Sequence, residues 1–327
     1  MTTHAFMEDE NALRKPEYSK DPSEEHFIER LGTDLQGLEK YLRVSSQPAR
    51  PNVFVFGLPR AGTTLVYQVL ANSLHVAWPT NLMARFWRVP VVGTRLSRML
   101  GLFNEEVRLE SRHGVTAGAA GPHEFGYFWM HWLGYNNVIQ KPAEHESTID
   151  WQGLKSALDA VSGEAQCPVI YKNTLFALHL PALQKMQPDA VFIYCKRNLR
   201  DAAVSILCTR KERYGTENEW WSLRPPHYEK LLTKLPDLQV AHQVCWFSQV
   251  FSEVFSQLPE TNRFAIQIEN SNTELPRLLG AIRQKLGIAP KPWNMPEIRI
   301  PHYKNTDQGR AFERIIATVR EDYPGLR

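Results

Sequence analysis

The stretch from Gly57 to Thr64 has the composition and spacing of an anion-binding loop. It reads Gly-Leu-Pro-Arg-Ala-Gly-Thr-Thr, follows an apolar run at residues 53–56 and precedes a helix-like stretch at residues 65–74. Two glycines with four residues between them let the backbone turn tightly, and the free N–H groups of the following helix attract negative charge. The sequence therefore predicts a strand, an anion-binding turn and a helix.

The cation of this loop is not where nucleotide-hydrolysing P-loops carry it. In those proteins a Lys follows the second Gly and reaches the outer phosphates, and the next Ser or Thr helps to hold Mg²⁺. Here Thr63 stands in place of that Lys, and the cation is Arg60, inside the loop. This arrangement suits one phosphate and makes no obvious provision for a metal. A turn without a ligand is the alternative, but the strand, the glycines, Arg60 and the pair Thr63-Thr64 together favour binding.

A second candidate anion site follows residues 190–195, an apolar run that predicts a buried strand. Arg197 comes at the carboxyl end of this strand, and a helix is predicted after it, with Asn198 as N-cap and Asp201 as its capping partner. Ser205 falls about two turns into that helix. Because ligands of open α/β sheets bind at the carboxyl ends of strands, we expect Arg197 and Ser205 to hold one phosphate.

With these two motifs in this order, the chain resembles the sulfotransferases that use 3′-phosphoadenosine 5′-phosphosulfate (PAPS), in particular their bacterial branch. In that family a loop of the form P-[K/R]-[S/T/A]-G-T-T binds the 5′-phosphosulfate, and an Arg followed eight residues later by a Ser binds the 3′-phosphate. The resemblance extends over residues 52–287. The positions that match the two motifs, and for which the resemblance implies contact with PAPS, are Arg60, Ala61, Gly62, Thr63, Thr64, Arg197 and Ser205.

The chain departs from the family pattern at three places. Ala61 stands where the loop often has Ser, so one hydrogen bond to the phosphosulfate is expected to be missing. The animal enzymes close over the 3′-phosphate with an R-K-G-x-x-G-x-W-K element that this sequence lacks; Lys304 and Arg310 are the candidates to replace it, unless they are solvated surface charges. The dimer motif K-x-x-x-T-V-x-x-x-E is unmet because Tyr323 occupies its last place, which leaves the oligomeric state open.

Sulfuryl transfer to a hydroxyl needs a base for the acceptor's proton, and residues 121–131 offer two candidates. Glu124 is the first choice, because many bacterial relatives carry a Glu in a similar G-P-x-E setting, and His123 is the second. Pro122 predicts a helix start with both residues in its first turn, where a Glu also favours the helix dipole without any catalytic role. His131 does not complete an H-E-x-x-H motif, so no zinc site is predicted.

Lys172 follows a short predicted strand at residues 168–171. In the animal enzymes a K-T-H run at this place supplies a Lys for the transferring group and a His base. Here the run is Lys-Asn-Thr, so the Lys is kept and the His is missing. The resemblance implies that Lys172 and Arg60 act together on the transferring group; an exposed charge at a strand end is the alternative.

These motifs predict an α/β fold of the P-loop nucleotide-binding type, with a central parallel sheet flanked by helices. Residues 1–22 are expected to be a loosely ordered polar segment, and residues 23–327 a single sulfotransferase domain. Within it, residues 75–165 and 211–236 are predicted as helical and loop excursions on the acceptor side. Residues 22–43 are amphipathic and predict a helix before the sheet.

Composition and charge agree with an ordinary globular enzyme. The 327 residues are 43% hydrophobic and 22% charged, enough to build a large core. A net charge of +3 is too small to argue for nucleic acid, no apolar stretch predicts a membrane span, and the first residues lack the pattern of a secretory signal. The four cysteines form no C-x-x-C pair, so reduced thiols and a cytoplasmic location are expected.

The sequence thus predicts a metal-independent sulfotransferase that moves a sulfuryl group from PAPS to a hydroxyl, less readily an amine, of a small or carrier-presented acceptor. The aromatic run at residues 125–132 and the pair Trp220-Trp221 indicate an apolar or ring-bearing acceptor, although aromatic residues at helical spacing also build cores. Two alternatives stay open. A P-loop small-molecule kinase would need the missing Lys and an acidic Mg²⁺ site, and a noncatalytic protein would bind adenosine phosphates without turnover.

Overall fold

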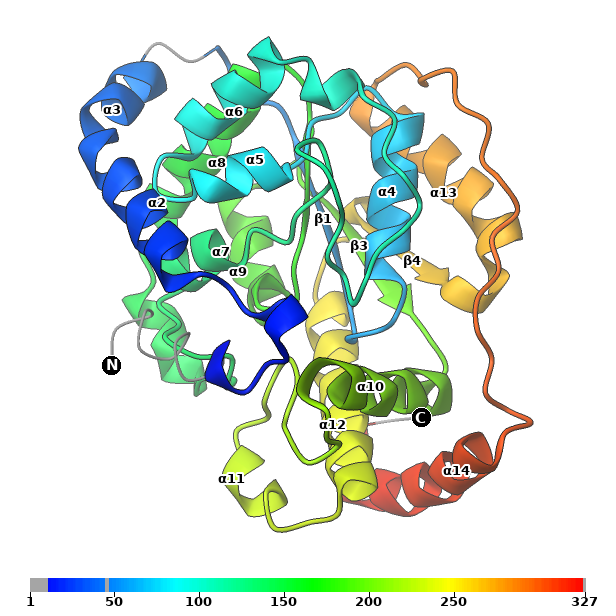
Figure 1. Cartoon of the computed structure of the whole chain (residues 1–327). Coiled ribbons are helices and arrows are strands. Elements are labelled where there is room, and N and C mark those ends of the chain that lie inside the picture. Colours follow the sequence, from blue (N-terminus) through cyan, green and yellow to red (C-terminus); the bar gives the residue numbers. More distant parts are fainter. Residues whose placement is uncertain (1–10, 45–46, 326–327) are drawn as a thin grey trace.

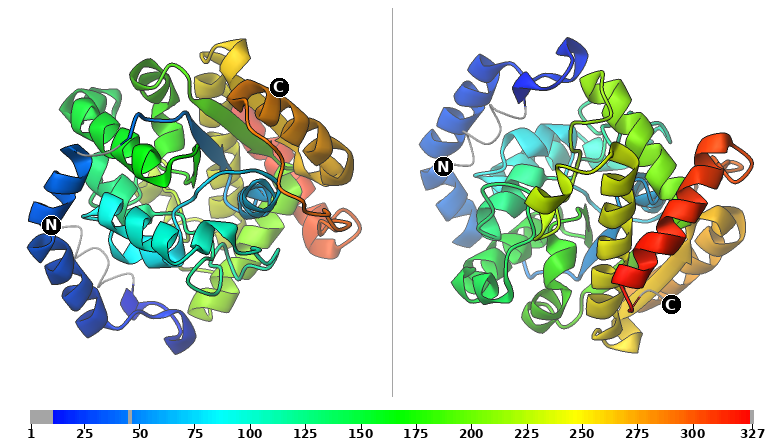
Figure 2. Two further views of the ribbon diagram at one scale, coloured as in Figure 1. Left: turned by 90° about the horizontal axis from the view of Figure 1, so that it is seen from above. Right: turned by 90° about the horizontal axis from the view of Figure 1, so that it is seen from below.

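Four parallel strands form the central sheet of the computed structural model, which describes residues 11–44 and 47–325 (Figure 1). Their spatial order is β2-β1-β3-β4, and helices cover both faces of the sheet (Figures 1 and 2). This confirms the predicted α/β class with a parallel sheet flanked by helices. The strands are β1 (Asn52–Gly57), β2 (Val169–Lys172), β3 (Val191–Lys196) and β4 (Arg263–Gln267).

The register of the strands brings the two predicted anion motifs to one edge of the sheet. Val55 of β1 lies beside Lys172 at the end of β2, and Gly57 lies beside Cys195 near the end of β3. Every residue of β1 is buried, as expected for a parallel strand covered on both faces. Because all four strands run in the same direction, the loops after β1, β2 and β3 open at the same edge.

Helices from several parts of the chain pack against the sheet. α12 packs on the face where the ring of Phe56 meets that of Phe251, with 5.9 Å between the centroids. α4 follows the loop after β1 and packs against β1 and β2, and α13 packs against β4. The α-helices are α2 (Pro22–Asp34), α3 (Gln36–Val44), α4 (Thr63–Ser73), α5 (Asn81–Arg85), α6 (Pro90–Met99), α7 (Gly126–Trp132), α8 (Trp151–Ala165), α9 (Leu180–Met186), α10 (Leu199–Tyr214), α11 (Tyr228–Leu231), α12 (Pro236–Ser256), α13 (Ser271–Leu286) and α14 (Asp307–Val319).

The helix predicted over residues 22–43 is divided in the structure. α2 ends before Leu35, whose N–H donates to the carbonyl of Leu31 at 3.0 Å, and α3 begins at the next residue. The amphipathic pattern therefore indicates the helical content correctly but does not reveal the turn between the two helices.

The described part of the N-terminal polar segment begins at Asn11 and packs against the rest of the molecule. The N–H of Lys15 donates to the carbonyl of Arg213 at 2.9 Å. The Nζ of Lys20 donates to the hydroxyl of Tyr127 at 2.6 Å. The prediction of a loosely ordered segment therefore does not describe these residues; the first ten residues lie outside the described part of the chain.

The start of α10 matches only half of its predicted cap. Asn198 is the N-cap, and its side chain accepts from the N–H of Arg200 at 3.0 Å. The predicted partner Asp201 does not return a bond, because the N–H of Asn198 donates to Glu269 instead, at 2.8 Å. The buried carboxylate of Asp201 accepts from Arg200 Nε at 2.9 Å and from the N–H of Tyr303 at 3.2 Å. It therefore ties the C-terminal segment to α10.

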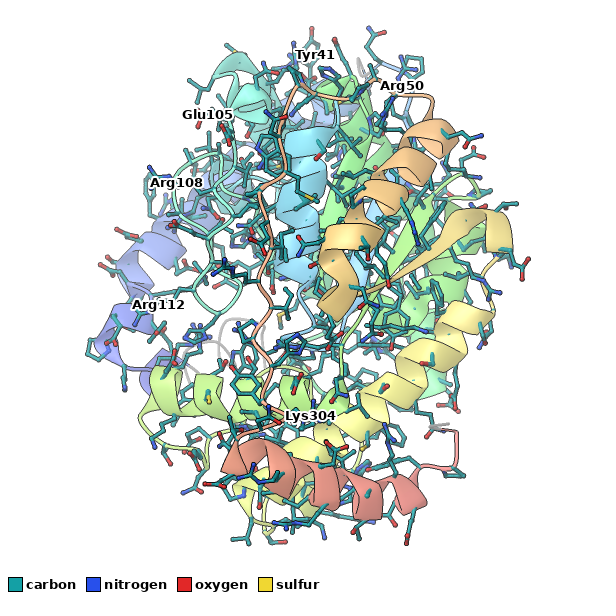
Figure 3. The ribbon with its side chains drawn as sticks, turned by 90° about the vertical axis from the view of Figure 1, so that its right-hand side faces the viewer. Tyr41, Arg50, Glu105, Arg108, Arg112 and Lys304 are labelled. Atoms are coloured by element: carbon teal, nitrogen blue, oxygen red, sulfur yellow. The ribbon has the colours of Figure 1, made fainter. Side chains whose placement is uncertain are left out.

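That C-terminal segment runs from α13 to α14 along the outside of the molecule (Figures 1 and 3). α14 then packs against α10 and α12. Within the described ranges, no helix is both long and apolar enough to cross a membrane.

Candidate active site

A cavity of about 1130 Å³ opens at the carboxyl edge of the sheet. Its wall includes the loop after β1, the end of β2, Arg197 after β3 and the start of α4. Parts of both predicted excursions, the N-terminal segment and the C-terminal segment complete it. The volume slightly exceeds the usual range for small-molecule sites, about 300 to 1,000 Å³, which leaves room for two reactants.

The two glycines of the predicted anion loop are required by the backbone itself. A Cβ on Gly57 would overlap the carbonyl oxygen of Cys195 in the neighbouring strand. Gly62 has φ +77°, in the left-handed region, and a Cβ there would overlap the side chain of Ile268. Close packing alone therefore accounts for the glycine spacing. Only the other residues of the loop indicate a bound ligand.

The N-terminus of α4 is open toward a ligand. Gly62 is its N-cap and supplies no side chain, and the first helical bond runs from the N–H of Val66 to the carbonyl of Gly62. Thr63 and Thr64 line the cavity, so the first N–H groups of the helix lie at its wall. Ala61 is placed differently: its side chain is completely buried, outside the cavity wall, and its N–H donates to the carbonyl of Leu58 at 3.0 Å.

The two predicted anion motifs touch each other through their arginines. Arg60 Nε donates to the hydroxyl oxygen of Ser205 at 2.9 Å, and Arg197 Nη1 donates to the carbonyl of Arg60 at 2.6 Å. Among the described residues neither guanidinium makes an ion pair. Burial and the neighbouring charge of Arg197 lower the pKa of Arg60, and Arg197 Nε is buried without a hydrogen-bond partner. The positive charge of the two guanidinium groups is therefore unpaired among the described residues, and a bound anion would neutralise it.

The two cations that were predicted to close over the 3′-phosphate do not line the cavity. Lys304 is exposed at the turn before α14, outside the cavity wall (Figure 3), and Arg310 pairs with Asp307 within α14. Ser205 is itself buried and reaches the cavity through Arg60.

The segment Pro296–Pro301, which no sequence motif marked, lines the cavity instead. Arg197 Nη2 donates to the carbonyl of Pro301 at 2.8 Å, and the side-chain amide of Asn272 bonds both the N–H and the carbonyl of Ile298, each at 2.8 Å. Prolines at both ends of a short segment are a signal for extended backbone that could have drawn attention to it.

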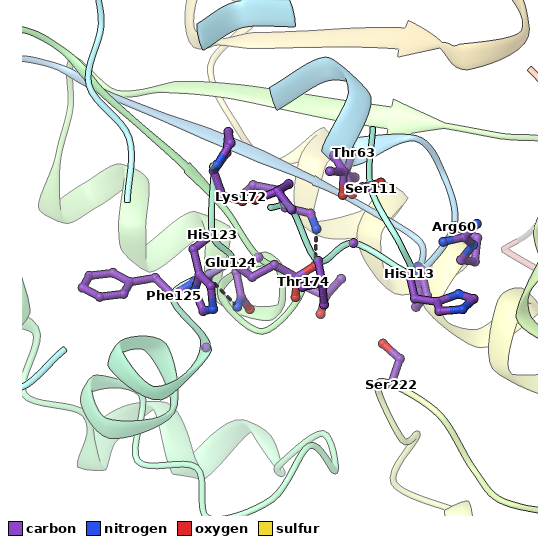
Figure 4. Close-up of a pocket in the computed structure, with 18 of the residues that line it drawn as sticks. Arg60, Thr63, Ser111, His113, His123, Glu124, Phe125, Lys172, Thr174 and Ser222 are labelled. Carbon is purple, nitrogen blue, oxygen red and sulfur yellow. Dashed lines mark hydrogen bonds and ion pairs between the residues drawn. The ribbon is translucent and has the colours of Figure 1, made fainter. Parts of the chain in front are cut away.

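Lys172 and Glu124 form an ion pair inside the cavity (Figure 4). The Lys172 side chain is only 5% exposed, so it is not the exposed strand-end charge considered as an alternative, whereas Glu124 is 47% exposed. The predicted helix start at Pro122 is wrong, because α7 begins at Gly126. Glu124 therefore stands in a loop, and Asn173 Nδ2 holds its carbonyl at 3.1 Å.

The imidazole ring of His123 is hydrogen-bonded to the backbone of this loop. Its Nδ1 accepts the N–H of Phe125 at 2.9 Å, and Phe125 has φ +56°, in the left-handed region. Burial lowers the pKa of His123 from its ordinary value of 6.5 to about 4. The ring is therefore neutral at pH 7 and, with Nδ1 assigned as the acceptor, carries its proton on Nε2. This leaves no free lone pair to take a proton from a ligand.

The aromatic run of residues 125–132 divides between the core and the cavity. Phe128 and Trp129 are fully buried in the core, whereas Tyr127 and Met130 line the cavity. Trp221 also lines the cavity, but Trp220 is buried beneath it against Tyr228. In the described part of the chain, no group of three or more His, Cys, Asp or Glu side chains could hold a metal ion.

The sequence matches the profile of the sulfotransferase family over residues 51–250, a range that contains both strand-end motifs, and the chain belongs to this family. No curated protein matches the chain. Among solved structures, it is similar to the sulfotransferase STF1 from Mycobacterium tuberculosis, with a TM-score of 0.50 and 12% identity over 90% of this chain and 82% of that chain. It is also similar to the sulfotransferase STF9 from Mycobacterium avium, with a TM-score of 0.49 and 14% identity over 86% of this chain and 78% of that chain. At such identities, the likeness to STF1 shows a common fold.

Proposed function

We propose that this sulfotransferase takes its sulfuryl group from PAPS and transfers it to a hydroxyl of a small or carrier-presented acceptor. The observation that carries the choice of donor is the contact between the two strand-end motifs. Arg60 and Arg197 meet at one cavity wall without a carboxylate partner in the described residues, which suits a ligand with two separate anionic groups. PAPS has this charge distribution, with a phosphosulfate on one carbon of its ribose and a phosphate on another.

In this proposal each motif holds one anionic group. Arg197 binds the 3′-phosphate, and the buried Ser205 supports this site by accepting from Arg60, which keeps both motifs in register. Arg60 and the first N–H groups of α4, at Thr63 and Thr64, bind the phosphosulfate. When bound, PAPS supplies an activated sulfuryl group, with 3′,5′-diphosphoadenosine as the leaving group.

Lys172 and Glu124 divide the remaining chemistry between them. Glu124, as a half-exposed carboxylate, accepts the proton of the acceptor hydroxyl as the oxygen–sulfur bond forms. Lys172 and Arg60 stabilise the negative charge that moves to the departing phosphate oxygen. His123 holds the Glu124 loop through its bond to Phe125 and does not take the proton itself.

The four cysteines are free thiols, which supports the reducing cytoplasm as the location. The wall on the acceptor side, with Tyr127, Met130 and Trp221, supports an apolar or ring-bearing acceptor. The kinase alternative has less support, because Thr63 occupies the place of the required Lys.

The test is donor turnover in the presence of a chelator. The purified protein is given PAPS, EDTA and a mixture of phenols and aliphatic alcohols, and formation of 3′,5′-diphosphoadenosine and of sulfated product is followed. We expect both to form with the wild type and to be strongly reduced with Glu124→Ala. Phosphoryl transfer from ATP that requires Mg²⁺, without any product from PAPS, would contradict the proposal in favour of a kinase. Binding of the nucleotide without turnover would favour the noncatalytic alternative.

A further inference from the structure

A tight hairpin that the sequence reading did not single out enters the cavity. Arg112 and Val115 exchange two backbone hydrogen bonds, at 2.9 and 3.0 Å. Between them His113 has φ +54° and Gly114 has φ +86°. Positive φ at both central residues is the pattern of a type I′ turn. The tip of this hairpin lines the cavity, and His113 lies beside Arg60 (Figure 4).

Gly114 stands where the proposed catalytic groups converge. A Cβ on Gly114 would lie 3.1 Å from Glu124 Oε1, 3.6 Å from Lys172 Nζ and 3.7 Å from Thr64 Oγ1. These three groups come from the loop before α7, the end of β2 and the start of α4. The Cβ position of Gly114 thus faces the proposed base, the buried cation and the start of α4 together.

The hairpin is held in this position from its other side. The His113 side chain is 6% exposed, and its Nε2 lies 2.8 Å from Glu212 Oε2 on α10. The ring of Tyr18 packs on His113, with 5.7 Å between centroids, and lies under the guanidinium groups of Arg112 at 4.6 Å and Arg213 at 5.1 Å. Because these contacts hold the hairpin, a side chain added at Gly114 would press on Glu124, Lys172 and Thr64.

We propose that Gly114 determines specificity for the sulfuryl group, because only a residue without a side chain leaves room for that group beside Lys172 and Thr64. This inference rests on the proposed function. PAPS and its product 3′,5′-diphosphoadenosine share both phosphates and differ in the sulfuryl group alone. Gly114 therefore matters for the binding of PAPS and not for the binding of 3′,5′-diphosphoadenosine.

The chain provides a matched control for the strain of the substitution. Gly118 lies in the same loop and has φ +78°, but a Cβ there would have nothing within 4 Å. Gly114→Ala and Gly118→Ala therefore impose similar backbone strain, and only the first places a methyl group against Glu124. Thermal unfolding of both variants compares their stability.

The experiment is calorimetric titration of the wild type and both variants with PAPS and, separately, with 3′,5′-diphosphoadenosine. We expect Gly118→Ala to bind both ligands as the wild type does. Gly114→Ala is expected to keep its affinity for 3′,5′-diphosphoadenosine and to bind PAPS about tenfold more weakly, which corresponds to one misplaced methyl group in a rigid site. If Gly114→Ala does not fold, Gly114→Asn serves with Gly118→Asn as control, since Asn tolerates positive φ better than Ala does.

An equal loss of affinity for both ligands in Gly114→Ala would overturn the inference, because the hairpin would then shape the whole donor site. Unchanged affinity for both ligands would overturn it as well. If the wild type binds neither ligand, the proposed function itself has failed, which is a result distinct from the other two.

Discussion

The proposed donor side and the proposed acceptor side of this cavity are built in different ways. The donor side consists of residues 57–64 with Arg197 and Ser205, and all of these except Ser205 stand within a few residues of a strand end or a helix start. The acceptor side combines the N-terminal segment, the 112–115 hairpin and the loop before α7 with residues 221–223. The first region depends on local backbone geometry and the second on packing between distant segments. Only the first can therefore be predicted from a short sequence motif.

The two sides also differ in charge balance. On the donor side Arg60 and Arg197 have no carboxylate partner among the described residues. Lys172, which lies between the two sides, pairs with Glu124, and on the acceptor side Lys20 pairs with Glu25 at 3.2 Å. The proposed donor side therefore favours an anion, whereas Lys20 already has a carboxylate partner, which suits an uncharged acceptor.

The largest effect is expected from the proposed base on the acceptor side. Glu124→Gln keeps the shape of the side chain and removes its ability to take a proton, so we expect kcat to fall by about 10²- to 10⁴-fold. Affinity for 3′,5′-diphosphoadenosine is expected to stay as in the wild type. Steady-state kinetics and calorimetry measure the two properties. His123→Asn, which can still accept the N–H of Phe125, should retain far more activity, and the opposite ranking would make His123 the base.

The next largest effect is expected at Arg60, where a loss of affinity for PAPS distinguishes a specific donor site from general surface charge. Arg60→Ala removes a partly buried guanidinium from the proposed phosphosulfate site, and we expect affinity for PAPS to fall by about 10- to 100-fold, the usual worth of a charge-assisted hydrogen bond. Arg277→Ala changes an exposed arginine on α13 and is the control. Equal affinities of the two variants, measured by calorimetry, would show that the arginine cluster does not hold the donor.

A pH effect on stability is expected from the neutral His123 in the acceptor-side loop. Its folded pKa of about 4 lies below the ordinary 6.5, so the unfolded chain binds the additional proton between these values. The contribution of this group is present above pH 6.5 and is lost as the pH falls toward 4. From pH 7 to pH 5 the wild type should lose about 2 kcal/mol more unfolding free energy than His123→Asn. Urea unfolding at the two pH values measures this difference, and parallel losses would contradict a buried neutral ring.

The smallest effect is expected at the rim of the acceptor side. Tyr18→Leu removes the ring that lies under Arg112 and Arg213 and should loosen the N-terminal segment. We expect the KM for the acceptor to rise by about three- to tenfold, from the loss of two cation–π contacts, with the affinity for 3′,5′-diphosphoadenosine unchanged. Tyr41→Leu, on the exposed surface of α3, is the control for the loss of a ring. A weaker donor affinity in Tyr18→Leu would place the segment on the donor side.

The sequence was sufficient for the parallel sheet, the loop around Arg60 and the placement of Arg197, because apolar runs, glycine spacing and strand ends are local signals. It was insufficient for the backbone around Glu124: Pro122 suggested a helix start, whereas Phe125 adopts positive φ and α7 begins only at Gly126. Tertiary contacts that no local pattern encodes decide such positions.

The C-terminal segment also shows that residue type alone does not predict which residues line the cavity. Lys304 has the charge expected of a residue that closes over a phosphate, but it lies outside the cavity wall. Pro301, which has no charge, receives the hydrogen bond of Arg197 through its carbonyl. Residue type alone could not distinguish these two positions, because the path of residues 287–306 is set by Asn272 and Asp201 on other elements.

The most direct test of the donor site is calorimetric titration with 3′,5′-diphosphoadenosine, beside 5′-AMP and ATP with Mg²⁺, in the wild type, Arg197→Ala and Arg277→Ala. The account predicts that the wild type and Arg277→Ala prefer the 3′-phosphorylated ligand in the presence of EDTA, and that Arg197→Ala loses this preference over 5′-AMP. Tighter binding of ATP with Mg²⁺, or an unchanged preference in Arg197→Ala, would contradict the assignment of the two strand-end motifs to PAPS.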